Sequence, residues 1–309
     1  MNRLSHADAS TFLSQYSGSI DLCYMDPPFN LGVSFTARTG PTERRTRNRR
    51  DVGPVAYDDR WPSVEAFIEF LQGVFTPLRE AMSPHGVVWI HLDHRAVHEA
   101  KVAADRIFGR GAFRGEVIWV PGNGARSKKG PSCTHQTLLV YAARPKSELV
   151  WNSDHPLLRE SFAATSLKMH FQSVDADGRQ YRDRAINGKT YRYYADEGRK
   201  LGSVWTDLPA MSANTPIRSE GTGYPTQKPE KLLERIILLS SKPGALVCDP
   251  MCGSGTTLVV AAKLDRSFVG CDIGELAIEI TSKRLHTAGI PFDADPPCTR
   301  PADGAHTSR

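Results

Sequence analysis

The segment YMDPPFN places a carboxylate, two prolines and an aromatic ring directly after the apolar run Ile20–Met25. A short apolar run that ends in polar residues is typical of a buried strand in a parallel sheet. Proline fixes its own φ and restricts the residue before it, so Pro27-Pro28 makes the loop after this strand rigid. The sequence therefore predicts a rigid loop that presents Asp26 and Phe29 at one place.

A second loop with chemical potential, DPMCGSGTT at residues 249–257, lies between a predicted strand and a predicted helix. Gly253 and Gly255 permit a tight turn and close approach of a ligand, and the start of the helix offers free N–H groups. Asp272 ends the next strand, where an acid can bind ribose hydroxyls. No lysine follows the second glycine, so the loop is not a nucleotide-phosphate loop. The pattern predicts a nucleoside ligand without a pyrophosphate, which S-adenosyl-L-methionine fits; a purely structural turn is the alternative.

The composition indicates a globular enzyme. Among the 309 residues, 40% are hydrophobic and 24% are charged, and no apolar run is long enough to span a bilayer or to act as a signal peptide. The six cysteines show no paired spacing, which predicts reduced thiols in the cytoplasm. Residues 38–50 hold six arginines and one glutamate, a net charge equal to the +5 of the whole chain. This run predicts a solvated loop, with phosphate contact and plain solvation as the two interpretations.

Hydrophobic periodicity predicts alternating strands and helices in both halves of the chain, which indicates a doubly wound, mostly parallel α/β sheet. In such a sheet the loops that follow the strands open at one edge, so the two loops described above should face each other. The predicted strands are Ile20–Met25, 86–91, 116–120, 137–142, 245–249 and Ser267–Asp272. The predicted helices are 63–82, 95–108, Glu230–Ser240, 256–264 and Glu275–Thr287.

Residues 150–223 depart from this pattern and predict an inserted module. Tyr, Arg, Asp and Gly alternate there, and Asn187-Gly188 separates two strand-like runs, which is a strong hairpin signal. Residues 1–149 and 224–289 are then the two halves of one domain. Residues 290–309 are rich in Pro, Asp and Ala without periodicity and predict a disordered tail.

On these elements the chain resembles the β group of amino-group DNA methyltransferases, the DNA methylase N-4/N-6 family. Asp26-Pro27-Pro28-Phe29 resembles the catalytic motif of that family, and residues 249–257 resemble its motif for S-adenosyl-L-methionine. The order of the two motifs is similar to that of the circularly permuted β group. Residues 224–233 (YPTQKPEKLL) resemble the segment before the cofactor motif, and residues 5–9 (SHADA) resemble a further segment whose glycine is missing here. The resemblance covers residues 5–145 and 222–288. The module is loosely similar to target-recognition regions of type III modification enzymes.

The resemblance implies a circularly permuted methyltransferase sheet with an inserted target-recognition module, acting on adenine N6 of double-stranded DNA. It implies catalytic roles for Asp26, Pro27, Pro28 and Phe29. It implies cofactor binding by Asp8, Lys228, Asp249, Gly253, Gly255, Thr256 and Asp272. DNA contacts are predicted for Asn30, Arg38, Arg44, Arg45, Arg47, Arg49, Arg50, Arg126, Lys128 and Lys129. For Asp8 the alternative is a helix N-cap, and for Lys228 it is a solvated helix start.

The residue types of the first loop suit an exocyclic amine, which is a poor nucleophile because its lone pair is delocalised into the ring. The carboxylate of Asp26 and the carbonyl of Pro27 would each accept one N–H and draw the nitrogen toward tetrahedral geometry. Phe29 would offer a face to a base extruded from the duplex. In the family, aspartate rather than serine at the first motif position favours adenine N6, with cytosine N4 as the alternative.

Other functions match the sequence less well. RNA and protein amines are alternative acceptors, and a catalytically idle DNA- or nucleoside-binding protein is the alternative from another class, against which the intact Asp26 and glycine loop argue. Three histidines within residues 91–98 have a spacing that could gather a metal, but no Cys or carboxylate set completes the site, so no metal is predicted. A cysteine nucleophile is rejected because Pro297-Cys298 falls in the predicted tail. A homodimer and a restriction subunit stay open as partners, and no membrane partner is expected.

Overall fold

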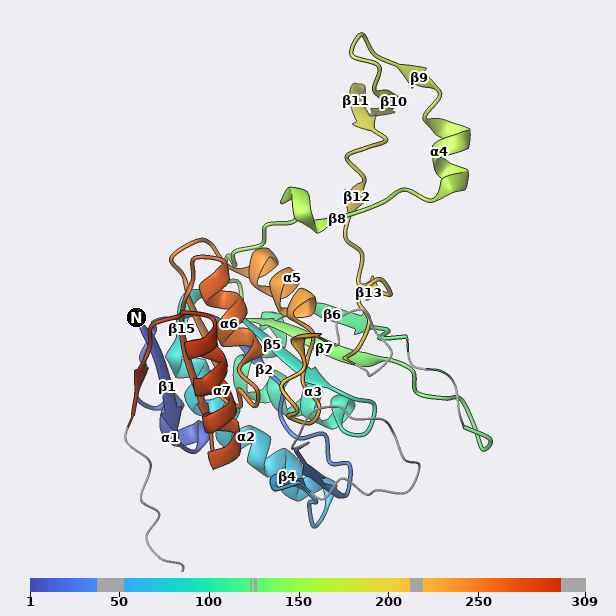
Figure 1. The fold of residues 1–309 in the computed structure, drawn as a ribbon. Coiled ribbons are helices and arrows are strands. Elements are labelled where there is room, and N and C mark those ends of the chain that lie inside the picture. Colours follow the sequence, from blue (N-terminus) through green and yellow to red (C-terminus); the bar gives the residue numbers. More distant parts are fainter. Residues whose placement is uncertain (38–52, 123, 125–126, 212–218, 296–309) are drawn as a thin grey trace, which may run out of the picture. The chain divides into compact units, whose positions relative to one another are not determined.

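The computed structural model describes residues 1–37, 53–122, 124, 127–211 and 219–295. The chain divides into two compact units (Figure 1). The larger unit contains Met1–Val150 and the chain from Val204 onward, and the smaller unit contains Trp151–Ser203. No helix among the described residues has both the length and the apolar character that crossing a membrane requires.

The larger unit is built on a nine-stranded sheet with the strand order β13-β6-β7-β5-β2-β14-β15-β1-β16. Its strands are β1 (Asn2–His6), β2 (Ile20–Met25), β5 (Met82–Leu92), β6 (Phe113–Trp119), β7 (Gln136–Ala142), β13 (Val204–Trp205), β14 (Leu246–Asp249), β15 (Ser267–Asp272) and β16 (Asp293–Ala294). Neighbouring strands are parallel except where β7 pairs with β5 and β6. The doubly wound, mostly parallel sheet predicted from the sequence is confirmed.

Helices cover both faces of this sheet (Figure 1). They are α1 (Ala9–Leu13), α2 (Val64–Ala81) and α3 (Val97–Phe108) on one face, and α5 (Glu230–Ser240), α6 (Thr256–Lys263) and α7 (Glu275–Thr287) on the other. Successive strand residues point to opposite faces. Val88 belongs to the core under α1–α3, whereas the indole of Trp89 donates to the Ser240 hydroxyl of α5 at 2.8 Å. Both faces are therefore apolar, as expected for central strands of a parallel sheet.

Three short elements complete the larger unit. A single turn, η1 (Arg110–Ala112), leads into β6. The antiparallel pair of β3 (Val33–Thr36) and β4 (Val55–Asp59) follows the loop after β2. Because the pair returns the chain toward its own start, the end of β4 lies beside that loop.

The smaller unit contains short elements around one hairpin. They are η2 (Pro156–Leu158), β8 (Arg159–Glu160), α4 (Ala164–His170), β9 (Ser173–Val174), β10 (Gln180–Ile186), β11 (Lys189–Tyr194) and β12 (Arg199–Lys200). Strands β10 and β11 are antiparallel, and Asn187 and Gly188 connect them with φ values of 49° and 77°. Positive φ at both central residues matches the right-handed twist of the strands, so the hairpin predicted from Asn-Gly is present.

Two predicted boundaries are wrong. The inserted unit ends at Ser203 rather than at residue 223, because Val204–Trp205 joins the main sheet as β13 beside β6. Residues 290–295 of the predicted disordered tail include a strand, since β16 pairs with β1, and the Asp295 carboxylate binds Arg3 at 2.8 Å. Strands of two residues are too short for hydrophobic periodicity to indicate them.

Candidate functional site

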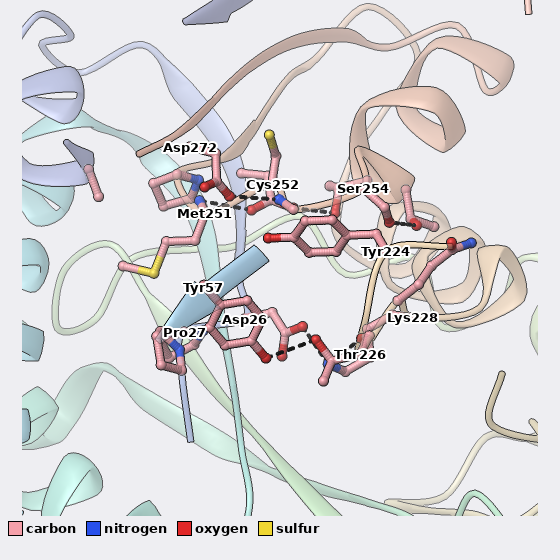
Figure 2. A pocket seen from close by; sticks show the side chains of 18 of the residues that line it. Asp26, Pro27, Tyr57, Tyr224, Thr226, Lys228, Met251, Cys252, Ser254 and Asp272 are labelled. Carbon is pink, nitrogen blue, oxygen red and sulfur yellow. Dashed lines mark hydrogen bonds and ion pairs between the residues drawn. The ribbon is translucent and has the colours of Figure 1, made fainter. Parts of the chain in front are cut away.

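A pocket at the carboxyl edge of the sheet brings the two predicted loops together. Its walls are the loops after β2, β14 and β15, the strand β4 and the segment before α5. Figure 2 shows Met251, Cys252 and Asp272 on one side of the pocket and Asp26, Pro27 and Lys228 on the other. The residues predicted from the sequence that line it are Asp8, Asp26, Pro27, Pro28, Phe29, Lys228, Asp249, Gly253, Thr256 and Asp272.

The loop after β2 is held in place by Asp59, a carboxylate that was not predicted from the sequence to belong to the site. Asp59 is fully buried at the end of β4. It accepts backbone N–H bonds from Phe29 at 3.1 Å, Asn30 at 2.8 Å and Leu31 at 3.0 Å. Asn30 has a left-handed φ of 58°, and such a turn aims successive N–H groups at one anion. The sequence signal was an acid at the end of a short strand, and no spacing rule connects it to this loop.

Asp26 forms a buried ion pair with Lys228. The Lys228 ammonium donates to Oδ2 of Asp26, and the two side chains are 9% and 19% exposed, respectively. Oδ1 of Asp26 is buried and has no hydrogen-bond partner among the residues that the structure describes; His91 Nδ1 lies 3.8 Å away. Burial raises the pKa of Asp26, and the adjacent Lys228 charge offsets part of this rise. The alternative of a solvated helix start for Lys228 is wrong, and the contact with Asp26 was not predicted.

His91 lies in a buried position behind Asp26. The hydroxyl of Tyr24 is 2.7 Å from His91 Nδ1, and the His91 ring is 5.8 Å from the ring of Phe29. Burial, together with the Lys228 charge, lowers the pKa of His91 well below its ordinary value. The imidazole is therefore neutral at physiological pH. Within the described part of the chain, no group of three or more His, Cys, Asp or Glu side chains is arranged to hold a metal ion.

The glycine loop after β14 is fastened to the end of β15. Asp272 accepts the backbone N–H of Gly253 through Oδ2 at 2.9 Å and that of Gly274 through Oδ1 at 2.8 Å. Burial raises the pKa of Asp272, and these two backbone N–H groups oppose the rise. Gly255 has a φ of 73° and does not line the pocket; a Cβ there would lie 2.5 Å from the Thr281 methyl group. The backbone conformation and the close approach of α7 both require glycine at position 255.

Asp249 lies at the start of the glycine loop and is hydrogen-bonded to two other residues of that loop. Its carboxylate accepts the Thr257 hydroxyl at 2.6 Å and the Met251 N–H at 3.2 Å. Burial raises the pKa of Asp249 to about 7, against the effect of these hydrogen bonds. The hydroxyl of Thr256 accepts from Arg284 at 2.9 Å. Both residues therefore stabilise the loop as well as line the pocket.

Aromatic rings form one wall between the two loops. The rings of Tyr57 and Tyr224 stack at 6.4 Å, and Phe35 stacks on Tyr57 at 4.9 Å. A Cβ at Gly253 would lie 3.2 Å from the Tyr224 ring, so glycine allows the loop to approach that ring closely. Figure 2 shows Tyr224 between the glycine-loop side chains and those around Asp26. Neither tyrosine was predicted from the sequence to have a role in the site.

The remaining predicted residues have different positions. Asp8 both lines the pocket and is the N-cap of α1, accepting the N–H of Ser10 at 2.9 Å. Asn30 shapes the loop after β2 and does not line the pocket. Lys128 and Lys129 are exposed in the loop between β6 and β7. The predicted DNA contacts Arg38, Arg44, Arg45, Arg47, Arg49, Arg50 and Arg126 lie outside the described residues.

Comparison with known proteins places the pocket in context. A protein-family model described as DNA methylase (N6_N4_Mtase) matches residues 20–283. The Type II methyltransferase M2.DpnII of Streptococcus pneumoniae is 29% identical over 91% of this chain and 88% of its own length. The DNA adenine methyltransferase YhdJ of Escherichia coli (strain K12) is 26% identical over 92% of this chain and 82% of its own length. The Type II methyltransferase M.EcaI of Enterobacter cloacae is 26% identical over 88% of this chain. The chain spans 66% of the length of that protein.

Solved structures share the fold. The protein TTHA0409 of Thermus thermophilus, complexed with S-adenosyl-L-methionine, matches with a TM-score of 0.55 at 18% identity, over 97% of this chain and 100% of that one. The PvuII DNA methyltransferase (cytosine-N4-specific) matches with a TM-score of 0.58 at 12% identity, over 92% of this chain and 86% of that one. At these identities the likeness concerns the fold.

Proposed function

This chain belongs to the DNA methylase family, and from that premise we propose that it transfers a methyl group from S-adenosyl-L-methionine to N6 of adenine in double-stranded DNA. The observation that carries the proposal is the pocket itself. A rigid acceptor loop with Asp26 and a glycine loop with Asp272 open into the same cavity, although more than half of the chain separates them. The name of the relative YhdJ, a DNA adenine methyltransferase, supports adenine as the base.

We assign the acceptor side of the reaction to the loop after β2. The Asp26 carboxylate lines the pocket and has one oxygen without a hydrogen-bond donor in the described part of the chain, and the carboxylate is assigned as the acceptor for one N–H of the target amine. The carbonyl of Pro27, fixed by the Pro27-Pro28 dipeptide, is assigned the other N–H. Two acceptors draw the lone pair out of conjugation and aim it, so most of the rate enhancement comes from orientation. Phe29 is assigned as the face on which the extruded base packs.

The cofactor side is assigned to the glycine loop and its neighbours. Asp272 retains lone pairs beyond its two backbone bonds and suits ribose hydroxyls, and the start of α6 beside Gly253 suits an anionic group. Tyr224 and Met251 supply apolar surface for a base. When bound, S-adenosyl-L-methionine supplies an electrophilic methyl group on a cationic sulfonium. Asp8, Asp249 and Thr256 are assigned to the walls of this subsite.

The DNA contacts rest on charge. We infer that the arginines of residues 38–50 and Arg126, with the exposed Lys128 and Lys129, contact phosphates, and that the smaller unit reads the target sequence. Asn30 is assigned an indirect role, through the shape of the loop after β2. A homodimer and a restriction subunit stay predictions from the sequence resemblance.

The test is product identification. The protein is incubated with methyl-labelled S-adenosyl-L-methionine and unmethylated duplex DNA of mixed sequence, and the digested nucleosides are separated. Labelled N6-methyldeoxyadenosine is the expected product. N4-methyldeoxycytidine would replace adenine by cytosine in the proposal. Label in RNA or protein but not in DNA would overturn the substrate, and cofactor binding without any transfer would support the idle binding protein.

A further inference from the structure

The ion pair between Lys228 and Asp26 gives the lysine a role that the cofactor assignment does not explain. We propose that Lys228 is a positioning residue for methyl transfer: its ammonium fixes the Asp26 carboxylate in one orientation and keeps it ionised for the target amine. This inference rests on the proposed function, because it specifies how that same site is prepared for its amine substrate.

The backbone around Lys228 is held, so its ammonium is delivered to one point. Gln227 donates to the Glu220 carbonyl at 2.8 Å and accepts the N–H of Thr222 at 3.0 Å. The hydroxyls of Thr226 and Tyr57 lie 3.0 Å apart. The next residue, Pro229, is the N-cap of α5. A lysine between two anchored neighbours loses less backbone freedom on pairing than a lysine on a free loop.

Asp26 needs such a partner because its surroundings oppose its charge. Burial favours the neutral carboxylic acid. The titratable groups around it are Asp249 from β14, whose carboxyl has a raised pKa of its own, the neutral His91 from β5, and three phenols. The phenols belong to Tyr24, Tyr57 and Tyr224, and the Asp26 charge contributes to a raised pKa in each of them. Among the described residues, Lys228 is the cation that contacts Asp26.

The carboxylate must be ionised for the chemistry proposed. A protonated Asp26 would present an O–H donor to an amine that also donates, and it would lose one acceptor. A misaligned carboxylate would aim the amine lone pair away from the methyl group. Lys228 acts against both failures through one contact, and its ammonium also lies 5.1 Å from the centroid of the Phe29 ring.

The rival role for Lys228 is to bind the carboxylate of the cofactor, and the two roles have different consequences. A cofactor anchor changes the Kd for S-adenosyl-L-methionine and leaves the ionisation of Asp26 unchanged. A positioning residue moves the titration midpoint of Asp26 and leaves the cofactor Kd nearly unchanged.

The experiment measures both. Wild type, Lys228→Met, Lys228→Arg and Lys263→Met are labelled with ¹³C at the aspartate carboxyl, and Asp26 is titrated by NMR after assignment with Asp26→Asn. Lys263 is the matched control, because it forms an exposed ion pair with Glu230 at 2.6 Å outside the pocket. Cofactor Kd and the pH dependence of kcat for DNA methylation are measured on the same proteins.

We expect Lys228→Met to raise the Asp26 midpoint by about one to three pH units, with the acidic limb of the kcat profile shifted by the same amount. Lys228→Arg should restore most of the wild-type behaviour, and Lys263→Met should match wild type throughout. An unchanged midpoint overturns the inference even if the wild type methylates no DNA, so the inference can fail separately from the proposed function. A shifted midpoint with an unshifted kcat limb overturns it too, and a large rise in cofactor Kd alone returns Lys228 to cofactor binding. If Lys228→Met does not fold, Lys228→Arg is compared with wild type in thermal melts and in the Asp26 titration. Wild-type behaviour of the arginine variant would show that the charge of Lys228 holds Asp26, and altered behaviour would show that the shape of the lysine side chain is needed.

Discussion

The pocket of the larger unit and the hairpin of the smaller unit use the same charged residue types in opposite ways. In the pocket, Asp26, Asp249 and Asp272 are largely buried, and burial raises the pKa of each carboxyl. In the hairpin region, Asp183 and Asp196 are exposed, and hydrogen bonds from arginine lower the pKa of each carboxyl.

The contrast agrees with the proposed division between pocket residues that take part in the reaction and hairpin residues that form a surface. A desolvated carboxylate has lost its contact with water, so its ionisation depends on the few protein groups that contact it. An exposed pair exchanges easily with water and adds little to stability. Replacing the exposed ion pairs of the smaller unit should therefore affect folding little.

Asp26→Ala should have the largest effect. Removing the carboxylate takes away the acceptor for the target amine, so kcat should fall by at least about 10³-fold. The glycine loop is untouched, and the Kd for S-adenosyl-L-methionine should stay within a few-fold of wild type. Single-turnover methylation and calorimetric cofactor binding check the two halves. Substantial remaining turnover would remove Asp26 from the mechanism.

Asp59→Asn tests whether buried geometry, rather than charge alone, distinguishes the pocket. Asparagine replaces one acceptor oxygen by a donor and breaks at least one of the bonds to Phe29, Asn30 and Leu31. A displacement of the loop by about 1 Å should lower kcat about 10²-fold with little change in cofactor Kd. The neighbouring Asp58→Asn is the control, because Asp58 is exposed and pairs with Arg60. Equal loss in both variants would contradict the assigned role of Asp59.

Gly255→Ala tests the glycine loop. Gly255 and Gly244 both have positive φ, 73° and 80°, but a Cβ at Gly255 meets Thr281 whereas a Cβ at Gly244 has no neighbour within 4 Å. Backbone strain should destabilise both variants by about 1–3 kcal/mol. Displacement of the loop should add a roughly tenfold rise in cofactor Kd to Gly255→Ala alone. Urea unfolding and calorimetry measure the two effects, and identical cofactor affinities would exclude the clash.

Asp249→Asn tests the sign of the electrostatic contrast. Burial raises the pKa of Asp249 to about 7, so the folded state holds a proton that the unfolded state has released. The contribution of Asp249 to stability is therefore present below about pH 4 and is lost as the pH rises to about 7, by at most about 1.4 kcal/mol per pH unit. Asparagine cannot titrate, so the difference in unfolding free energy between wild type and variant should fall with pH across this range. Parallel pH curves from urea unfolding would show that Asp249 is not perturbed.

The sequence predicted the meeting of the two loops because topology alone enforces it. Residues 249–257 and the loop after β2 each follow a parallel strand, and parallel strands end at the same edge. The contacts within the pocket were not predictable in this way. The Asp59 bonds and the Lys228–Asp26 pair join segments that no periodicity relates, and they depend on the direction in which each side chain leaves its backbone. The same limit explains the missed strands β13 and β16, which are defined by their partners.

Arg192→Ala should have the smallest effect and is the sharpest control for the contrast. Arg192 pairs with Asp183 at 2.9 Å and lies over the Tyr181 ring at 3.7 Å, all on an exposed hairpin face. Because water replaces these contacts, the unfolding midpoint and the cofactor Kd should not change measurably.

Arg184 and Lys189 are exposed on the same hairpin and have no acidic partner among the described residues, so Arg184→Ala with Lys189→Ala should weaken DNA binding and lower its salt slope by about two. Binding isotherms at several salt concentrations compare the two sets. An unchanged slope in the double variant would mean that this hairpin does not contact phosphates, and a loss of stability in Arg192→Ala would mean that its exposed pairs support the fold.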